Sequence, residues 1–310
     1  MNIYLLYFCL CAFLSWITCE LSITFLRKHF LIKPIKRSSH DKDKPTAGGI
    51  HFVTISTIFS YLNNFIMPLN CIPLSIIGFI DDKFNLKPIY RLVFQITTIC
   101  ILLNNSPINN YLLENFNFIS YYLIEIILIF CATACINFIN FVDGLDGLLS
   151  GTMFIIISTL AISNPNLWII SGSIFGFLFL NWNPSKVFMG DGGSTFLGAI
   201  YIGILTSSNN IIDFTKIVLL ASPILVDPFI CVIRRLYNKK SIITPHKSFL
   251  FQRLNLGGLS HQNISLIYIF LTSLLSLSYI FGNIFWMILI IILEIPIAFY
   301  LEIKVASKFN

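Results

Sequence analysis

The chain alternates long apolar runs with short polar breaks. The runs are about 18 to 22 residues long, which is the length that crosses a bilayer as an α-helix, whereas barrel strands would give shorter segments of alternating polarity. Helical spans are predicted at 3–25, 49–66, 68–80, 89–104, 119–137, 147–163, 167–181, 195–207, 216–232, 263–281 and 284–303. Several are short, so one of them could be broken or re-entrant. We predict an all-α, polytopic membrane protein with about 10–11 transmembrane helices.

The composition favours a single membrane domain. Of the 310 residues, 56% are hydrophobic and only 11% are charged, against about 25% charged residues in soluble domains. The first run, 3–25, has no basic segment before it and no small-residue cleavage site after it, so we expect a retained span rather than a signal peptide. No internal repeat or soluble segment divides the sequence. Residues 1–310 are therefore expected to form one integral-membrane domain with cytoplasmic active-site loops.

The basic residues predict the orientation of the chain. The formal net charge is +6, but Lys and Arg cluster in loops beside the spans, which is typical of membrane topology and not of nucleic-acid binding. The loop 27–46 is rich in both and is assigned to the cytoplasm. Alternation then places on the same face the loops 81–88, 138–146, 182–194 and 233–262 and the C-terminal tail. We expect a multi-pass protein of the cell inner (plasma) membrane.

The same alternation gathers the polar segments of the chain on the cytoplasmic face. Charged side chains are costly in the hydrocarbon, so acidic residues beside spans are functional candidates. The segments are Lys44–Gly49, Asp81–Asp82, Asn137–Gly147, Gly190–Ser194 and Arg234–His261. We expect these five segments to form one site.

The segment Asn137–Gly147 has the composition of a site for a divalent cation with phosphates. Asp143 and Asp146 are three residues apart, so both carboxylates can face one point, and Gly144 lets backbone approach a ligand closely. Mg²⁺ prefers hard oxygen ligands and usually takes one or two protein carboxylates, with water and substrate phosphate completing its shell. The alternative is a polar loop that caps two helices.

Two further acidic segments carry candidate chemistry. Asp81 and Asp82 are adjacent, and mutual repulsion raises the pKa of at least one carboxyl unless a cation compensates, which suits a general base. Asp191 lies in a glycine-rich turn before a predicted span, where backbone N–H groups favour phosphate. Asp191 itself would repel phosphate unless a metal ion lay between them. The alternatives are a membrane-boundary marker for the first pair and an ordinary turn for Asp191.

The basic candidates are Lys44, at a glycine-rich helix start, and His246 and Arg253 in the last long cytoplasmic loop. Each could contact phosphate, and each could equally be a charge that sets topology or a solvated basic face. Asp227 lies near the cytoplasmic end of its span. It is expected to pair with Arg234 or Arg235, or to belong to the edge of the site.

In combination and order, the polar segments resemble the polyprenyl-phosphate N-acetylhexosamine-1-phosphate transferase family. The matching motifs are Lys44-Pro-Thr-Ala-Gly-Gly, Gly78-Phe-Ile-Asp-Asp, Asn137-Phe-Ile-Asn-Phe-Val-Asp-Gly-Leu-Asp-Gly-Leu and Phe188-Met-Gly-Asp-Gly-Gly-Ser. The resemblance implies transfer of a sugar-1-phosphate from a UDP-sugar to a membrane lipid, undecaprenyl phosphate, with release of UMP. It also implies Mg²⁺ as cofactor, with Mn²⁺ as a substitute, and leaves a homodimer open.

The resemblance further implies roles for individual residues. Asp191 corresponds to the metal ligand, with Asp143 beside the metal, and Asp81 to the position that deprotonates the lipid phosphate, with Asp82 next to it. The implied substrate-binding residues are Lys44, Asn137, Asn140, Asp143, Gly144, Leu145, Asp146 and Arg253. His246 is the remaining catalytic candidate in the last loop.

One departure from the family pattern bears on substrate choice. Many members carry a His-x-His-His-type cluster in the last cytoplasmic loop, and here those positions fall on Phe249, Phe251 and Gln252. This form resembles the branch that initiates surface polysaccharides such as the O-antigen of lipopolysaccharide. The alternatives are the phospho-MurNAc-pentapeptide transferase of peptidoglycan synthesis and, in another class, a cation-coupled transporter, which predicts carboxylates near the bilayer midplane.

Overall fold

The computed structural model describes residues 3–32, 43–104, 106–241, 244 and 246–309. Its elements in chain order are α1 (Ile3–His29), β1 (Leu31–Ile32), β2 (Lys44–Pro45), α2 (Gly49–Leu62), α3 (Met67–Phe84), α4 (Pro88–Asn104), α5 (Pro107–Asn115), α6 (Phe118–Val142), α7 (Leu148–Ala161), α8 (Leu167–Asn181), α9 (Asp191–Thr206), α10 (Ile211–Leu220), α11 (Ser222–Tyr237), α12 (Leu250–Leu256), α13 (His261–Phe281) and α14 (Ile284–Lys304). The prediction of an all-α polytopic membrane protein is confirmed.

All predicted spans coincide with helices. In the described part of the chain, four helices are long and apolar enough to cross a membrane, namely α1, α6, α13 and α14, and the α10–α11 pair would be a fifth. The prediction of one continuous span at 216–232 is wrong, because α10 and α11 meet at an angle of 76°. Pro223 follows the break and has no N–H to continue the hydrogen bonding of α10. Helices α5 and α12 were not predicted.

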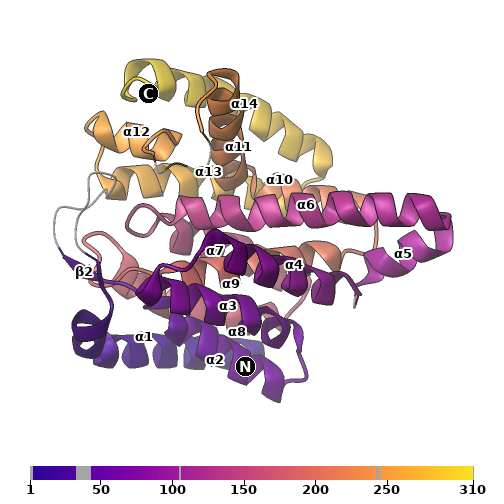
Figure 1. Cartoon of the computed structure of the whole chain (residues 1–310), viewed down its shortest axis with the longest axis horizontal. Helices are drawn as coiled ribbons and strands as arrows, with labels where there is room; N and C mark the ends of the chain where they lie inside the picture. The colour runs from indigo at the N-terminus through magenta and orange to yellow at the C-terminus, as the bar shows by residue number, and fades with distance from the viewer. Residues whose placement is uncertain (1–2, 33–42, 105, 242–243, 245, 310) are drawn as a thin grey trace.

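Most helices lie side by side in a bundle, with β2 and α12 at one end and α5 at the other (Figure 1). Helix α9 forms its centre, and every residue from Gly192 to Thr206 is buried. The outer helix α14 has Met287 as its buried residue and otherwise exposes large apolar side chains. In a membrane protein such a surface faces lipid, and the core lies among the inner helices.

Glycines allow the inner helices to approach closely. On α8, a methyl group at Gly172 or Gly176 would overlap backbone of α1, at Phe8 and Ala12 respectively. This spacing is typical of small residues at membrane helix interfaces. On α3, a Cβ at Gly78 would lie 2.6 Å from the carbonyl oxygen of Asp191. The bare backbone at Gly78 therefore brings the end of α3 against the start of α9.

The short strands attach the first basic loop to the bundle. β1 and β2 pair antiparallel, with Leu31 opposite Pro45. The Pro45 carbonyl accepts a hydrogen bond from the Phe188 amide at 2.8 Å, and the Gly48 amide donates to the Phe188 carbonyl at 2.9 Å. Residues 33–42, which include several of the basic residues used to assign orientation, lie outside the described residues.

Candidate active site at one end of the bundle

Residues of all five polar segments line one cavity, which also extends along the bundle to Leu103 and Ile108 at the α5 end. Its volume is 1640 Å³. The candidate site residues that line it are Asp82, Asn137, Asn140, Asp143, Gly144, Leu145, Asp191 and His246. Arg91 and several uncharged polar side chains also line it, but most of the remaining wall is apolar and includes Leu128 and Phe138 of α6 and Val226 and Phe229 of α11. The cavity therefore joins an acidic end to an apolar wall formed by two helices.

Asp82 fixes the start of α9. Its Oδ1 accepts a hydrogen bond from the Asp191 amide at 2.9 Å, and its Oδ2 accepts one from the Gly192 amide at 3.5 Å. A carboxylate at a helix N-terminus satisfies free N–H groups and is favoured by the helix dipole. Gly190 precedes this turn with φ +79°, a conformation that favours glycine. The turn thus holds the carboxyl groups of Asp82 and Asp191 in one place.

Asp81 and Asp191 share a cationic partner that the sequence reasoning missed. Nη1 of Arg91, on the first turn of α4, lies 3.0 Å from Asp81 Oδ2 and 2.7 Å from Asp191 Oδ2. Asp81 Oδ1 also accepts a hydrogen bond from the Leu86 amide. The available signal is an arginine nine residues after Asp82, near the start of the predicted span 89–104.

Asn140 and Asn137 hold α6 against its neighbours. Asn140 Oδ1 accepts a hydrogen bond from the Ser194 hydroxyl of α9. Asn137 and Gln95 of α4 exchange hydrogen bonds of 3.1 and 3.3 Å between their amide groups. Both asparagines line the cavity as well. Their hydrogen bonds hold neighbouring helices together. Because both side chains also line the cavity, they would lie beside a bound substrate.

Asp143 is the C-cap residue of α6 and lines the acidic end of the cavity. Burial, together with the negative charges of Asp191, Asp82 and Asp146, raises the pKa of Asp143 well above its usual range. A hydrogen bond with the Gly190 backbone opposes this effect. The environment therefore disfavours an uncompensated charge on Asp143, and a bound cation would remove that penalty.

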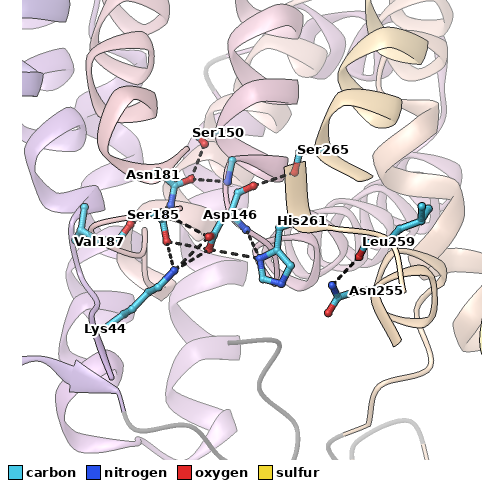
Figure 2. A network of polar contacts seen from close by, with 11 residues as sticks. Lys44, Asp146, Ser150, Asn181, Ser185, Val187, Asn255, Leu259, His261 and Ser265 are labelled. Atoms are coloured by element: carbon cyan, nitrogen blue, oxygen red, sulfur yellow. Dashed lines mark hydrogen bonds and ion pairs between the residues drawn. The ribbon is translucent and has the colours of Figure 1, made fainter. Parts of the chain in front are cut away.

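Asp146 is not among the residues that line the cavity. It forms the centre of a polar network (Figure 2). Its carboxylate accepts hydrogen bonds from the Ser185 hydroxyl at 2.8 Å and the Ser185 amide at 3.1 Å. Lys44 Nζ lies 3.2 Å from Oδ2, and His261 Nδ1 lies 3.6 Å from Oδ1. The Asp146 carbonyl accepts from the Ser265 hydroxyl at 2.9 Å. These contacts join β2, the loop after α8 and the start of α13.

The network holds Asp146 in its charged form. Burial alone would raise the pKa of this carboxyl, but hydrogen bonds from His261 and Ser185 and the charge of Lys44 outweigh it, so the pKa lies below its usual range. Lys44 Nζ also lies 5.1 Å from the centre of the Phe188 ring. Phe188 and Leu145 face the cavity. Asp146 and Lys44 therefore support an aromatic and apolar wall.

The last loop reaches the site through α12. A Cβ on Gly144 would lie 3.0 Å from the Phe251 ring and 3.8 Å from Gln252 Nε2, so α12 packs directly on the Gly144 turn. His246, Phe249 and Gln252 line the cavity. Burial, followed by the charge of Arg235, lowers the pKa of His246 to about 4. The His246 imidazole is therefore neutral at pH 7.

The expected partner of Asp227 was wrong. Its carboxylate accepts hydrogen bonds from the backbone amides of Leu250 at 2.7 Å and Phe251 at 3.2 Å, and from the Tyr268 hydroxyl at 2.8 Å, in place of an arginine. Asp227 thus caps the N-terminus of α12. A cap contributed by a side chain 23 residues earlier in the chain leaves no local pattern in the sequence.

Arg253, a candidate substrate-binding residue, points away from the main cavity. Its side chain is 3% exposed and pairs with Glu302 of α14, and its Nη1 donates to the Ser307 carbonyl at 3.0 Å. It lines a separate cavity of 250 Å³ between α11, α13 and α14. In this structure Arg253 ties α12 to the C-terminal segment.

The donor atoms at the acidic end fit a small divalent cation. No cluster of three or more His, Cys, Asp or Glu side chains suited to a metal is found among the described residues. The oxygens of Asp81 and Asp191 nevertheless converge on one positive group, the Arg91 guanidinium. Asp191 and Asp143, the two carboxylates expected to hold the metal, both line the cavity. One or two carboxylates are what Mg²⁺ usually takes from a protein, since water and phosphate complete its shell.

Comparison with known proteins identifies the family. Residues 64–209 match the family described as glycosyl transferase family 4. A probable undecaprenyl-phosphate N-acetylglucosaminyl 1-phosphate transferase of Bacillus subtilis is 30% identical over 81% of this chain and 78% of the relative. An undecaprenyl-phosphate alpha-N-acetylglucosaminyl 1-phosphate transferase of Thermotoga maritima is 31% identical over 77% of this chain and 78% of the relative.

Relatives of a second kind are named for another activity. A phospho-N-acetylmuramoyl-pentapeptide-transferase of Prochlorococcus marinus is 36% identical over 59% of this chain and 60% of the relative. The family resemblance inferred from the four acidic and glycine-rich motifs is therefore confirmed. This chain belongs to the glycosyl transferase family 4 superfamily of polyprenyl-phosphate hexosamine-1-phosphate transferases, and it is a multi-pass membrane protein.

Proposed function

We propose that the protein transfers N-acetylhexosamine-1-phosphate from a UDP-sugar to undecaprenyl phosphate, releasing UMP, as the first step of a lipid-linked surface polysaccharide. The observation that carries this proposal is the shape and polarity of the main cavity. Its acidic end is lined by Asp82, Asp143 and Asp191, and its wall between α6 and α11 is apolar. A polyprenyl phosphate has the same two-part character, with an anionic head and a long apolar tail.

The reaction is a substitution at phosphorus. A phosphate oxygen of the lipid bonds to the sugar-linked phosphorus of the UDP-sugar, and the bond from that phosphorus to the bridging oxygen breaks. UMP leaves with the bonding pair, and the product is a polyprenyl diphosphate that carries the sugar. Such transfers depend on positioning and on neutralisation of the anionic oxygens more than on covalent help from the protein.

The chain's residues divide these tasks. Asp81, with Asp82 beside it, is the candidate base that takes a proton from the lipid phosphate when this is the monoanion. Lys44, Gly144, Leu145 and Asp146 form or support the candidate nucleotide wall, and Asn137 and Asn140 border the reacting groups. Asp191 and Asp143 are the candidate Mg²⁺ ligands. The cation would supply neutralisation of the two phosphate groups.

The proposed setting is the inner (plasma) membrane with the acidic end facing the cytoplasm, where UDP-sugars are available. The chain acts as one domain in this proposal. The distribution of Lys and Arg among the loops supports this orientation. The polar residues cluster at one end of the bundle, whereas the transporter alternative requires carboxylates near mid-depth.

The donor separates the proposal from the peptidoglycan alternative. The purified protein is assayed in detergent with Mg²⁺ and undecaprenyl phosphate, with UDP-GlcNAc, other UDP-N-acetylhexosamines and UDP-MurNAc-pentapeptide offered separately. We expect lipid-dependent UMP release with one simple UDP-N-acetylhexosamine. Release with the pentapeptide donor alone would assign the chain to the peptidoglycan branch. Absence of release with every donor, from protein that unfolds cooperatively, would overturn the proposal.

A further inference from the structure

The acidic end of the cavity contains a cation from the chain itself. Three carboxyl groups line it, from Asp82, Asp143 and Asp191, and the Asp81 carboxyl group shares the Arg91 guanidinium with that of Asp191. Arg91 Nη1 lies 3.0 Å from Asp81 Oδ2 and 2.7 Å from Asp191 Oδ2. These are the distances of charge-assisted hydrogen bonds. One guanidinium therefore holds together carboxylates from two helices, α3 and α9.

Arg91 is placed to move. Its side chain is 24% exposed and lines the main cavity, and Asp191 is 32% exposed. A partly exposed ion pair costs far less to separate than a fully buried one, because water replaces the lost contact. The backbone of Arg91 belongs to the first turn of α4, so a change of side-chain rotamer can carry the guanidinium into the cavity while the helix stays in place.

A divalent cation and this guanidinium exclude each other. Mg²⁺ bonds to oxygen at about 2.0 to 2.1 Å. Ligation by Oδ2 of Asp191 therefore requires the space that Nη1 of Arg91, 2.7 Å from that oxygen, now occupies. A guanidinium has no lone pair to offer a metal, and two positive groups at this distance repel. Cation binding therefore has to displace Arg91 from at least one of its carboxylates.

We propose that Arg91 is an internal counter-ion that holds Asp81 and Asp191 in place until a divalent cation replaces it, and that the displaced guanidinium then binds a phosphate group of the substrate. This inference rests on the proposed function for the identity of the substrate. The planar guanidinium matches two phosphate oxygens at once, and the cavity it faces is the one lined by Asp82 and Asp143.

This arrangement couples two binding events. When phosphate captures the displaced Arg91, the guanidinium no longer competes with the cation, so each ligand strengthens binding of the other by the same factor. A site without Arg91 would bind the cation tightly on its own and would lose the coupling. The competition and the coupling are thus separate consequences of one side chain.

The test measures Mn²⁺ affinity by electron paramagnetic resonance on the full chain in detergent. It compares the wild type, Arg91→Gln and Arg91→Lys, each alone, with farnesyl phosphate and with UDP-GlcNAc. Without substrate, we expect Arg91→Gln to bind Mn²⁺ about tenfold more tightly than the wild type, a ratio that corresponds to 1.4 kcal/mol. Arg91→Lys, which keeps the charge, should stay within about threefold of the wild type.

The two substrate arms identify which phosphate Arg91 binds. Tighter Mn²⁺ binding by the wild type with farnesyl phosphate, absent in Arg91→Gln, assigns Arg91 to the lipid phosphate. The same result with UDP-GlcNAc alone assigns it to the nucleotide diphosphate. Lys216→Gln, which removes one positive charge at the other end of the bundle, serves as the control and should leave Mn²⁺ affinity unchanged.

Unchanged or weaker Mn²⁺ binding by Arg91→Gln, or substrate coupling equal to that of the wild type, would overturn the inference. Its failure is distinguishable from failure of the proposed function. If the wild type transfers sugar-phosphate but Arg91→Gln does not change the Mn²⁺ affinity, only the counter-ion role is contradicted. If Arg91→Gln changes the Mn²⁺ affinity as expected but the wild type transfers no sugar-phosphate, only the transferase assignment is contradicted.

Discussion

The backbone amide of Asp191 donates a 2.9 Å hydrogen bond to Oδ1 of Asp82. One candidate catalytic carboxylate therefore caps the helix that begins with another. Asp82 belongs to the last turn of α3, and the bare backbone at Gly78 is what brings that turn against α9. The site depends on this junction of α3 and α9 as much as on the chemistry of the individual side chains.

Asp82→Asn and Asp82→Ala should separate the capping role from the charged role. Asparagine keeps an acceptor for the Asp191 amide, so Asp82→Asn should retain most of the stability while transfer falls by about 10²-fold or more. Asp82→Ala should lose transfer and also about 1 kcal/mol of stability, because the cap is gone. Thermal unfolding in detergent and UMP release measure the two effects. Equal stability of the two variants would contradict the capping role.

Gly190→Ala should be strongly destabilising for two reasons. Its φ of +79° and ψ of 167° lie in a region that only glycine adopts readily, at a cost to other residues of about 1–3 kcal/mol. A Cβ there would also collide with the Asp82 carboxylate and lie 2.9 Å from the Ala47 amide nitrogen. Gly258→Ala is the matched control, since Gly258 has φ +106° and open space around it. We expect a larger fall in Tm for Gly190→Ala. A fall no larger than that of the control would show that the turn has room.

The pKa values of Asp146 and Asp143 are displaced in opposite directions, so their asparagine variants should show opposite pH dependence. The pKa of Asp146 is depressed, so its stabilisation is complete above about pH 4 and is lost as the pH falls through the folded-state value. Asp146→Asn should therefore be costly at pH 7 and nearly neutral in acid. Denaturant unfolding in the presence of EDTA, at several pH values, measures the difference.

For Asp143 the raised pKa means that the folded state binds more protons than the unfolded chain above about pH 4. The wild type consequently loses stability as the pH rises from 4 toward 7. Asp143→Asn removes this loss and should become increasingly stabilising over that range when no divalent cation is present. If the free energy of unfolding changes with pH in the same way for the wild type and Asp143→Asn, ionisation of Asp143 does not destabilise the folded state.

Tyr268→Phe should loosen α12. The Tyr268 hydroxyl donates to the Asp227 carboxylate at 2.8 Å, and loss of a bond to a charged group costs about 1.5–3 kcal/mol. Tyr201→Phe is the control, because the Tyr201 hydroxyl donates to a neutral acceptor, the Ile217 carbonyl, at 3.0 Å. Its loss should cost about 0.5–1.5 kcal/mol. Urea unfolding gives the costs, and limited proteolysis should show faster cleavage near residues 238–241 only in Tyr268→Phe.

The helices could be predicted because each is specified by the apolar residues of its own stretch of sequence. A run of apolar residues such as 119–137 defines a membrane helix whatever its neighbours, and α6 extends over it. The break between α10 and α11 and the short helix α12 were not predictable in this way. The first depends on packing around Ala221 and Pro223, and the second on a cap contributed by Asp227.

The sequence allowed us to predict that the acidic loops lie together, but not which residues contact one another. Alternation of spans placed the acidic loops on one face, and Asp82, Asp143 and Asp191 do line one cavity. The bridge from Arg91 to Asp81 and Asp191 and the pair Arg253–Glu302 could not be predicted from the sequence. These pairs join residues 10 to 100 positions apart. Such contacts are set by the packing of helices and not by spacing along the chain.

The central claim is that the sugar travels together with its phosphate, and the fate of the β-phosphorus tests it most directly. Wild-type protein in detergent is given Mg²⁺, undecaprenyl phosphate and a UDP-N-acetylhexosamine labelled with ³²P at the β-phosphate, and Asp191→Asn serves as the inactive control. We predict that the label moves into the lipid phase with the sugar while unlabelled UMP is released. Label that remains in aqueous UDP while the sugar enters the lipid phase would contradict the account.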